Sequence, residues 1–197
     1  MLEIEVWKIG DSLAAPKFNI VSKPNDWGKT QKTNNGLGKA QKLQGEFWQA
    51  FGEYGASNEE YSKEFNKRKA LPQHWYDLPM GSSEYHISLT CATQRNEIGI
   101  EVYIDNNKEI YDLFYENKDM IEEKTCLKYK WQRLDNKKAS RIKAIKKCNV
   151  NNQEEWEEAF EWFCRQALII KKIFNNKRKA KYVVNYFAFY VYKEKSK

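Results

Sequence analysis

Two apolar stretches that meet across a short polar turn constrain the fold of this chain most. They read YHISLTCATQ over residues 85–94 and EIGIEVYID over residues 97–105, with Arg95-Asn96 between them. In the second stretch, isoleucine and valine alternate strictly with Glu97, Gly99, Glu101 and Tyr103. Such alternation places one face of a strand in a core and leaves the other face to water or a ligand. We therefore expect an antiparallel hairpin with one open face.

The pattern of the remaining chain predicts the fold class. Apolar residues at helical spacing predict helices, and shorter apolar stretches predict further strands. The expected helices are Lys39–Tyr54, Glu59–Lys69, Asn107–Thr125 and Asn152–Asn175, with Ser57-Asn58 as a cap. The further strands are Leu127–Leu134 and Ser140–Cys148, and residues 74–83 are expected to form a loop. This order, α-β-β-α-β-β-α, predicts an α+β fold in which helices pack on an antiparallel sheet of about four strands.

The two ends of the chain have a different character. Leu2–Lys8 and Phe18–Lys23 are typical of strands, with Gly10, Asp11 and Pro16 as turn formers between them. Tyr182–Tyr192, YVVNYFAFYVY, is dense in aromatic and β-branched residues and is flanked by lysines, which is typical of an edge or partner-facing strand. We divide the chain into an N-terminal strand pair (1–27), a polar linker (28–38), an α+β domain (39–175) and a basic, aromatic tail (176–197).

Composition excludes several classes of protein. No apolar run approaches the ~20 residues that a membrane helix needs, and the N-terminus lacks the basic region of a signal peptide. We therefore expect a cytoplasmic protein without membrane contact. The four cysteines are Cys91, Cys126, Cys148 and Cys164. Zinc sites usually take closely spaced ligand pairs, which are absent from this sequence, so we expect free thiols and neither a metal nor a cofactor.

The basic residues are unevenly distributed. The net charge is +7, and the run from Lys137 to Lys147 holds six Lys or Arg residues and no acid. If the strands on either side of residues 135–139 pair, their basic side chains share one face or edge, and Tyr103 and Trp131 could stack on bases. The candidate nucleic-acid-binding residues are Lys128, Lys130, Lys137, Lys138, Arg141 and Lys143. The alternative is an ordinary solvated lysine face, with Trp131 in the core.

Catalytic patterns are incomplete. Gly28-Lys29-Thr30 lacks the upstream glycine of a phosphate-binding loop, since Lys23 stands at that position. Asp135 and Lys137 match the acid-x-Lys pair of metal-dependent nucleases, but a partner acid is missing. In the expected hairpin His86 falls near Tyr103–Asp105, so it could perform acid–base chemistry with a carboxylate across the sheet, or it could be a hydrogen-bonded histidine of the sheet face. We find no complete catalytic constellation, which favours a non-enzymatic role.

Two motifs carry a resemblance to a known family. The strand Gly99-Ile100-Glu101-Val102-Tyr103-Ile104, followed by a helix and the sequence KKASRI at 137–142, resembles the bacterial "domain of unknown function 4268" family. The opening sequence VWKIGDSLAAPKFNIVSKPNDW and the helix with Trp156 and Trp162 are similar to it as well. In longer relatives the family domain follows a nuclease-like domain of the PD-(D/E)XK class. The resemblance implies that residues 1–27 are the last strands of such a domain and that its catalytic motif has no counterpart here.

These observations give two main expectations for function. The first is a non-catalytic accessory module of a nuclease-type bacterial protein that contacts nucleic acid through its basic face. The alternative is a protein-interaction or oligomerisation module without a nucleic-acid role, in which Tyr182–Tyr192 contacts a nuclease domain or a second copy of the chain.

Overall fold

The computed structural model describes residues 2–7, 15–20 and 37–174. The chain divides into two compact units, Met1–Gly38 and Lys39–Lys197. In the first unit, β1 (Leu2–Trp7) pairs antiparallel with β2 (Ala15–Ile20). The predicted start of the second strand at Phe18 was wrong, because β2 begins at Ala15 and includes Pro16. A strand in a two-stranded pair is an edge strand, where a residue without an N–H is tolerated. The predicted strand Tyr182–Tyr192, the tail 176–197 and most of the linker 28–38 lie outside the described residues.

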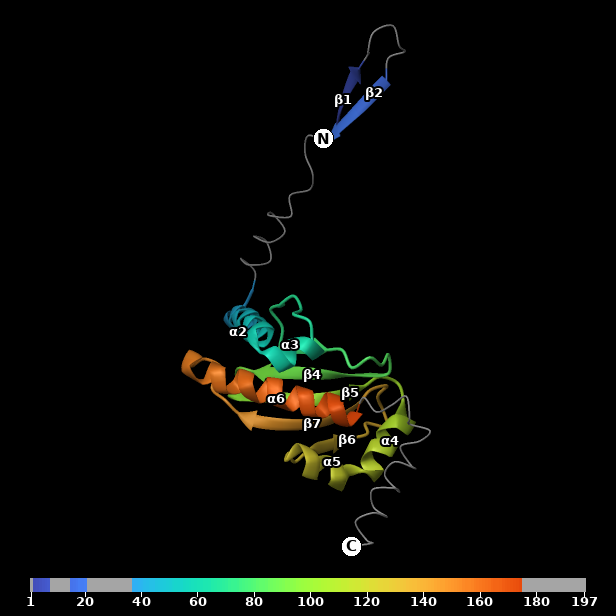
Figure 1. Ribbon diagram of the computed structural model, residues 1–197, viewed down its shortest axis with the longest axis vertical. Coiled ribbons are helices and arrows are strands. Elements are labelled where there is room, and N and C mark those ends of the chain that lie inside the picture. Colours follow the sequence, from blue (N-terminus) through green and yellow to red (C-terminus); the bar gives the residue numbers. More distant parts are fainter. Residues whose placement is uncertain (1, 8–14, 21–36, 175–197) are drawn as a thin grey trace. The chain divides into compact units, whose positions relative to one another are not determined.

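The second unit is built on an antiparallel sheet (Figure 1). Its described residues form five strands in the order β3-β4-β5-β7-β6, which confirms the predicted α+β fold with one strand more than expected. The strands are β3 (Trp75–Leu78), β4 (Tyr85–Ala92), β5 (Glu97–Ile104), β6 (Lys130–Gln132) and β7 (Ser140–Lys147). The additional strand is β3, which lies in the segment predicted as a loop.

The central hairpin of β4 and β5 has the predicted partners but a longer turn. Ala92 pairs with Glu97, so residues 93–96 form the turn instead of Arg95-Asn96 alone. The Arg95 N–H donates to the carbonyl of Ala92 at 3.1 Å. Asn96 has a positive φ of 50°, a conformation that asparagine tolerates better than most residues.

The helices agree with the predictions except at their ends and at one break within a predicted helix. They are α2 (Lys39–Ser57), α3 (Glu59–Glu64), α4 (Lys108–Glu116), α5 (Lys118–Thr125) and α6 (Trp156–Phe174), with a 3-10 turn at Gln153–Glu155. Asn58 caps α3 as expected, since its side chain accepts from the Tyr61 N–H at 2.9 Å. The predicted helix Asn107–Thr125 breaks at Asn117, whose side-chain amide donates to the Leu113 carbonyl at 2.8 Å. In the described residues, no helix is both long enough and apolar enough to cross a membrane.

The helices and the inward side chains of the sheet form one core. Helix α6 packs over the sheet, roughly along the direction of its strands, and contacts β4 and β5 (Figure 1). Phe163 of α6 contacts the rings of Phe47 and Phe51 of α2, and Ile100 and Ile142 of the sheet are fully buried in the same cluster. Burial of this apolar area is the main source of stability. The opposite face of the sheet lies outside this cluster and carries the candidate site.

Candidate functional site

The strand register arranges the outward side chains of the sheet in rows. The central row contains one residue from each strand, namely Asp77, Ser88, Glu101, Lys143 and Lys130 in sheet order. The row on one side contains His86, Tyr103, Arg141 and Gln132. The row on the other side contains Trp75, Thr90, Gly99 and Ile145. We call these three rows together the polar face, and most of its side chains carry a charge or a hydrogen-bonding group.

Glu101 occupies the middle of the polar face. It was expected to face water, but the residue is only 3% exposed, because a central strand has neighbours on both sides. Its Oε2 is buried and accepts no hydrogen bond from the described residues, and its Oε1 lies 3.9 Å from Nη1 of Arg141. A buried carboxylate oxygen without a donor is costly and rare in folded proteins. Glu101 is therefore the most unusual group of this face.

Lys143 is the register partner of Glu101, but its side chain lies over Gly99. A Cβ added to Gly99 would come within 3.1 Å of Cε of Lys143 and 2.7 Å of Oγ1 of Thr90. Burial lowers the pKa of Lys143 below its usual value, although the nearby carboxylate of Glu101 opposes this. Among the described residues, none accepts a hydrogen bond from the Lys143 ammonium. Two groups of opposite charge thus lie on adjacent strands, and neither has a hydrogen-bond partner among the described residues.

A ladder of flat side chains lies beside the central row. The rings of His86 and Tyr103 have their centroids 5.1 Å apart, and the guanidinium of Arg141 lies 5.2 Å from the centroid of Tyr103. His86 Nε2 lies 3.5 Å from Oδ1 of Asp77. The carboxylate beside His86 is therefore Asp77 of β3 and comes from the strand on the other side of β4 from the hairpin partner β5, where Asp105 was expected. Burial raises the pKa of Asp77, but hydrogen bonds from His86 and Ser88 outweigh it and lower the pKa overall.

The arrangement of these groups does not form a nucleophilic triad. A triad needs the histidine between the hydroxyl and the acid, whereas here Asp77 accepts from both His86 and Ser88. Asp135 pairs with Arg133, and the acid bound to the same guanidinium, Asp112, is engaged by it as well. In the described residues, no three His, Cys, Asp or Glu side chains are placed to hold a metal ion.

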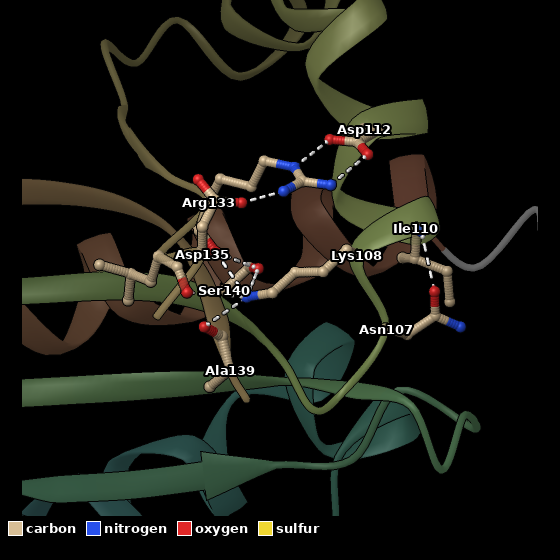
Figure 2. A network of polar contacts seen from close by, with 9 residues as sticks. Asn107, Lys108, Ile110, Asp112, Arg133, Asp135, Ala139 and Ser140 are labelled. Atoms are coloured by element: carbon tan, nitrogen blue, oxygen red, sulfur yellow. Dashed lines mark hydrogen bonds and ion pairs between the residues drawn. The ribbon is translucent and has the colours of Figure 1, made fainter. Parts of the chain in front are cut away.

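The loop between β6 and β7 is held by a paired network (Figure 2). Nζ of Lys108 contacts the carbonyl oxygens of Arg133, Leu134 and Ala139 at 2.6, 3.1 and 3.1 Å. It also contacts Oγ of Ser140 at 2.9 Å. Arg133 donates from Nε and Nη2 to the two carboxylate oxygens of Asp112 at 2.7 and 3.0 Å, which is a bidentate pair. Lys108 therefore fixes the loop from the start of α4.

The six predicted binding residues are divided among three places. Lys130, Arg141 and Lys143 lie together on the polar face, and Lys137 and Lys138 are exposed in the β6–β7 loop. Lys128 precedes β6, since the strand predicted at Leu127–Leu134 is limited to Lys130–Gln132, and its Nζ pairs with Oε2 of Glu122 at 2.8 Å. Trp131 faces the core side opposite Ile142 and donates to Oε1 of Glu122 at 3.0 Å, so the core interpretation holds for it.

Sequence reasoning missed Asp77, Ser88 and Lys108 as contributors to this region. The alternation of Trp75-Tyr76-Asp77-Leu78 was a signal for Asp77, but four residues are too few to separate a strand from a loop. No local pattern indicates Lys108, because its partners lie 25 to 32 residues further along the chain.

Fold and site together define an α+β domain whose antiparallel sheet is packed by helices on one face and carries a polar, partly unpaired set of charges on the other. The family described as "Domain of unknown function (DUF4268)" matches residues 43–178. The match covers more than half of the chain, which therefore belongs to this family. The two motifs of the earlier resemblance meet in the sheet, where Tyr103 pairs with Arg141. No curated protein and no solved structure matches the chain.

Proposed function

We propose that this chain is a non-catalytic accessory module of a nuclease-type bacterial protein and contacts nucleic acid through its basic face. We define the basic face as Lys130, Arg141 and Lys143 on the sheet together with Lys137 and Lys138 in the adjoining loop. The observation that carries the proposal is the pairing of β6 with β7, which brings basic side chains from two strands to the same side.

The attraction between the basic face and nucleic acid is electrostatic. Lys and Arg side chains that gather on one surface attract the phosphates of nucleic acid and release condensed counterions when they bind. Lys137 and Lys138 are exposed at the end of the same hairpin, so they extend the positive surface beyond the sheet. The network around Lys108 holds this loop in place, which reduces the entropy lost on binding.

The test is fluorescence anisotropy with short labelled DNA and RNA over a range of salt concentrations. We expect affinity to fall as salt rises and the variant Lys137→Glu/Lys138→Glu/Arg141→Glu to lose binding. The matched control is Lys39→Glu/Lys42→Glu/Lys69→Glu, which reverses three exposed charges elsewhere in the same unit and should retain binding. No binding at low salt, or an equal loss in both variants, would overturn the proposal.

A second candidate is a protein-interaction module, favoured by two apolar side chains on the polar face. Trp75 is 38% exposed and Ile145 is 51% exposed, and large exposed apolar groups are enriched at interfaces. This role predicts self-association that is lost in the double variant Trp75→Ser/Ile145→Ser, measured by sedimentation velocity. Removal of the residues after Asn175 tests the tail in the same way. A monomer at all concentrations would exclude self-association.

A further inference from the structure

Glu101 and Lys143 of the polar face have no hydrogen-bond partner among the described residues and are placed for recognition of a base. We propose that Glu101 and Lys143 bind the Watson–Crick edge of a guanine in an unpaired nucleic-acid strand. This inference deepens the proposed nucleic-acid contact and rests on it. It assigns base selectivity to Glu101, while the lysines of the basic face supply affinity for phosphate.

The carboxylate of Glu101 provides the hydrogen-bond acceptors of the proposed site. Glu101 is only 3% exposed, and its Oε2 accepts no hydrogen bond from the described residues. Its Oε1 lies 3.9 Å from Arg141, which is beyond hydrogen-bonding distance. Both oxygens can therefore accept from a ligand, and a ligand that offers two adjacent donors satisfies the carboxylate best.

The ammonium of Lys143 provides a hydrogen-bond donor beside this carboxylate. Lys143 is opposite Glu101 in the sheet, is held over Gly99, and has no hydrogen-bond acceptor among the described residues. A ligand for both groups presents an acceptor beside its donors. Guanine has this order on one edge, since O6 accepts while N1–H and N2–H₂ donate; bases in unpaired strands are read on this edge.

Two further side chains of the polar face affect how a base reaches Glu101 and how a second base could stack beside it. Oε2 of Glu101 is covered in this structure, so a base reaches it only when a long side chain turns aside. Arg141 is suited to this movement, because its side chain is 44% exposed. Trp75 lies on the same face at the β3 edge and is 38% exposed. Its indole offers a stacking surface for a second base, and stacking does not discriminate between bases.

The experiment compares a labelled thymidine oligonucleotide with the same oligonucleotide carrying one central guanine, and repeats the comparison with a uridine oligonucleotide. We expect the wild-type chain to bind the guanine-containing strand about tenfold more tightly, which is within the range for a bidentate base contact. The DNA and RNA arms show which kind of strand supplies the base. Substitution of adenine or cytosine for the central guanine should give no comparable gain.

Two glutamine variants separate base recognition from general electrostatics. Glu101→Gln should abolish the tenfold preference while retaining binding to the thymidine strand. Glu97→Gln removes the same charge from the same strand and face, so it should keep the preference. Trp75→Ala should weaken binding to all strands by a similar factor. Unchanged thermal unfolding would show that each variant is folded.

The outcomes distinguish the two proposals. Equal binding of all strands by the wild type, a preference for another base, or a guanine preference that survives Glu101→Gln would overturn the role of Glu101 and leave the nucleic-acid contact standing. Failure to bind any strand at low salt would overturn both.

Discussion

Two groups of charged side chains in the same domain differ in how many hydrogen-bond partners they have. In the β6–β7 loop, Lys108 contacts four oxygens, and Arg133 is paired with the carboxylates of Asp112 and Asp135. On the polar face, Glu101 and Lys143 are neighbours in register, yet both lack a hydrogen-bond partner among the described residues. Charges that are fully hydrogen-bonded within the domain maintain the fold, whereas charges that have no hydrogen-bond partner in the described part of the domain are available for recognition.

The largest expected effect is in the paired group. Lys108→Met keeps a long side chain but removes every donor, so three carbonyl oxygens and the Ser140 hydroxyl lose their bonds to the ammonium. The Arg133 carbonyl still accepts from Oγ of Ser140, and the Leu134 carbonyl still accepts from the Lys137 N–H. We expect a loss of about 2 to 3 kcal/mol in the free energy of unfolding, because hydrogen bonds from charged groups are worth more than neutral ones. Urea denaturation measures this as a shift of the midpoint.

The matched variant is Lys143→Met on the polar face. It removes a half-buried charge without a hydrogen-bond partner in the described part of the chain, so the free energy of unfolding should change by less than about 1 kcal/mol in either direction. Similar losses in Lys108→Met and Lys143→Met would contradict the distinction between paired and unpaired charges.

A smaller effect is expected at Gly99, which sets the position of Lys143. In Gly99→Ala the new methyl group would lie 2.7 Å from Oγ1 of Thr90 and 3.1 Å from the carbonyl oxygen of Ala144. We expect a loss of about 1 to 2 kcal/mol, since crowding of a packed site costs more than the substitution gains in chain entropy.

Gly45 in α2 provides the control for this substitution. Its added Cβ would meet Pro72 at 3.6 Å, an ordinary contact, and alanine is the better helix former. Gly45→Ala should therefore stabilise the domain by up to about 1 kcal/mol in the same urea experiment. A stabilised Gly99→Ala variant would show that Thr90 and Lys143 move aside at little cost.

The predictability of the fold follows the length of each pattern. The alternation in Glu97–Ile104 and the helical period of Trp156–Phe174 extend over enough residues to identify β5 and α6. β3 has four residues, and its strand character depends on pairing with β4, so the local sequence could not establish it. The break at Asn117 was not predicted either, because it depends on the conformation of one residue, whose side chain bonds the Leu113 carbonyl at the end of α4.

The candidate site was harder to predict, since it depends on register. Alternation correctly placed Glu101 on the face away from the isoleucines, but it could not show that neighbouring strands would bury the residue to 3% exposure. The position of Lys143 over Gly99 likewise requires the β5–β7 pairing. Basic residues can be found in a sequence, whereas the presence or absence of a partner for each charge is a property of the folded chain.

The smallest expected effect concerns Asp77, the paired acid of the polar face. Hydrogen bonds from His86 and Ser88 and the charges of His86 and Arg68 lower the pKa of Asp77 below its ordinary 3.8, against the effect of burial. A lowered pKa means that the ionised acid stabilises the fold above the ordinary value, and that this contribution is lost as pH falls through the lower pKa of the folded state.

Asp77→Asn should therefore be less stable than the wild type by about 0.5 kcal/mol near neutral pH, a value typical of partly exposed pairs. The difference should disappear in acid, below the lowered pKa of Asp77, and urea midpoints measured across this range provide the test. Ser88→Ala removes only the hydroxyl that donates to Asp77. In that background the loss of stability caused by Asp77→Asn should be smaller than in the wild type. A difference in stability between Asp77→Asn and the wild type that persists at the lowest pH would show that Asp77 acts through the shape of its side chain and not through its charge. The pair of Asp77 and His86 would then contribute nothing to folding.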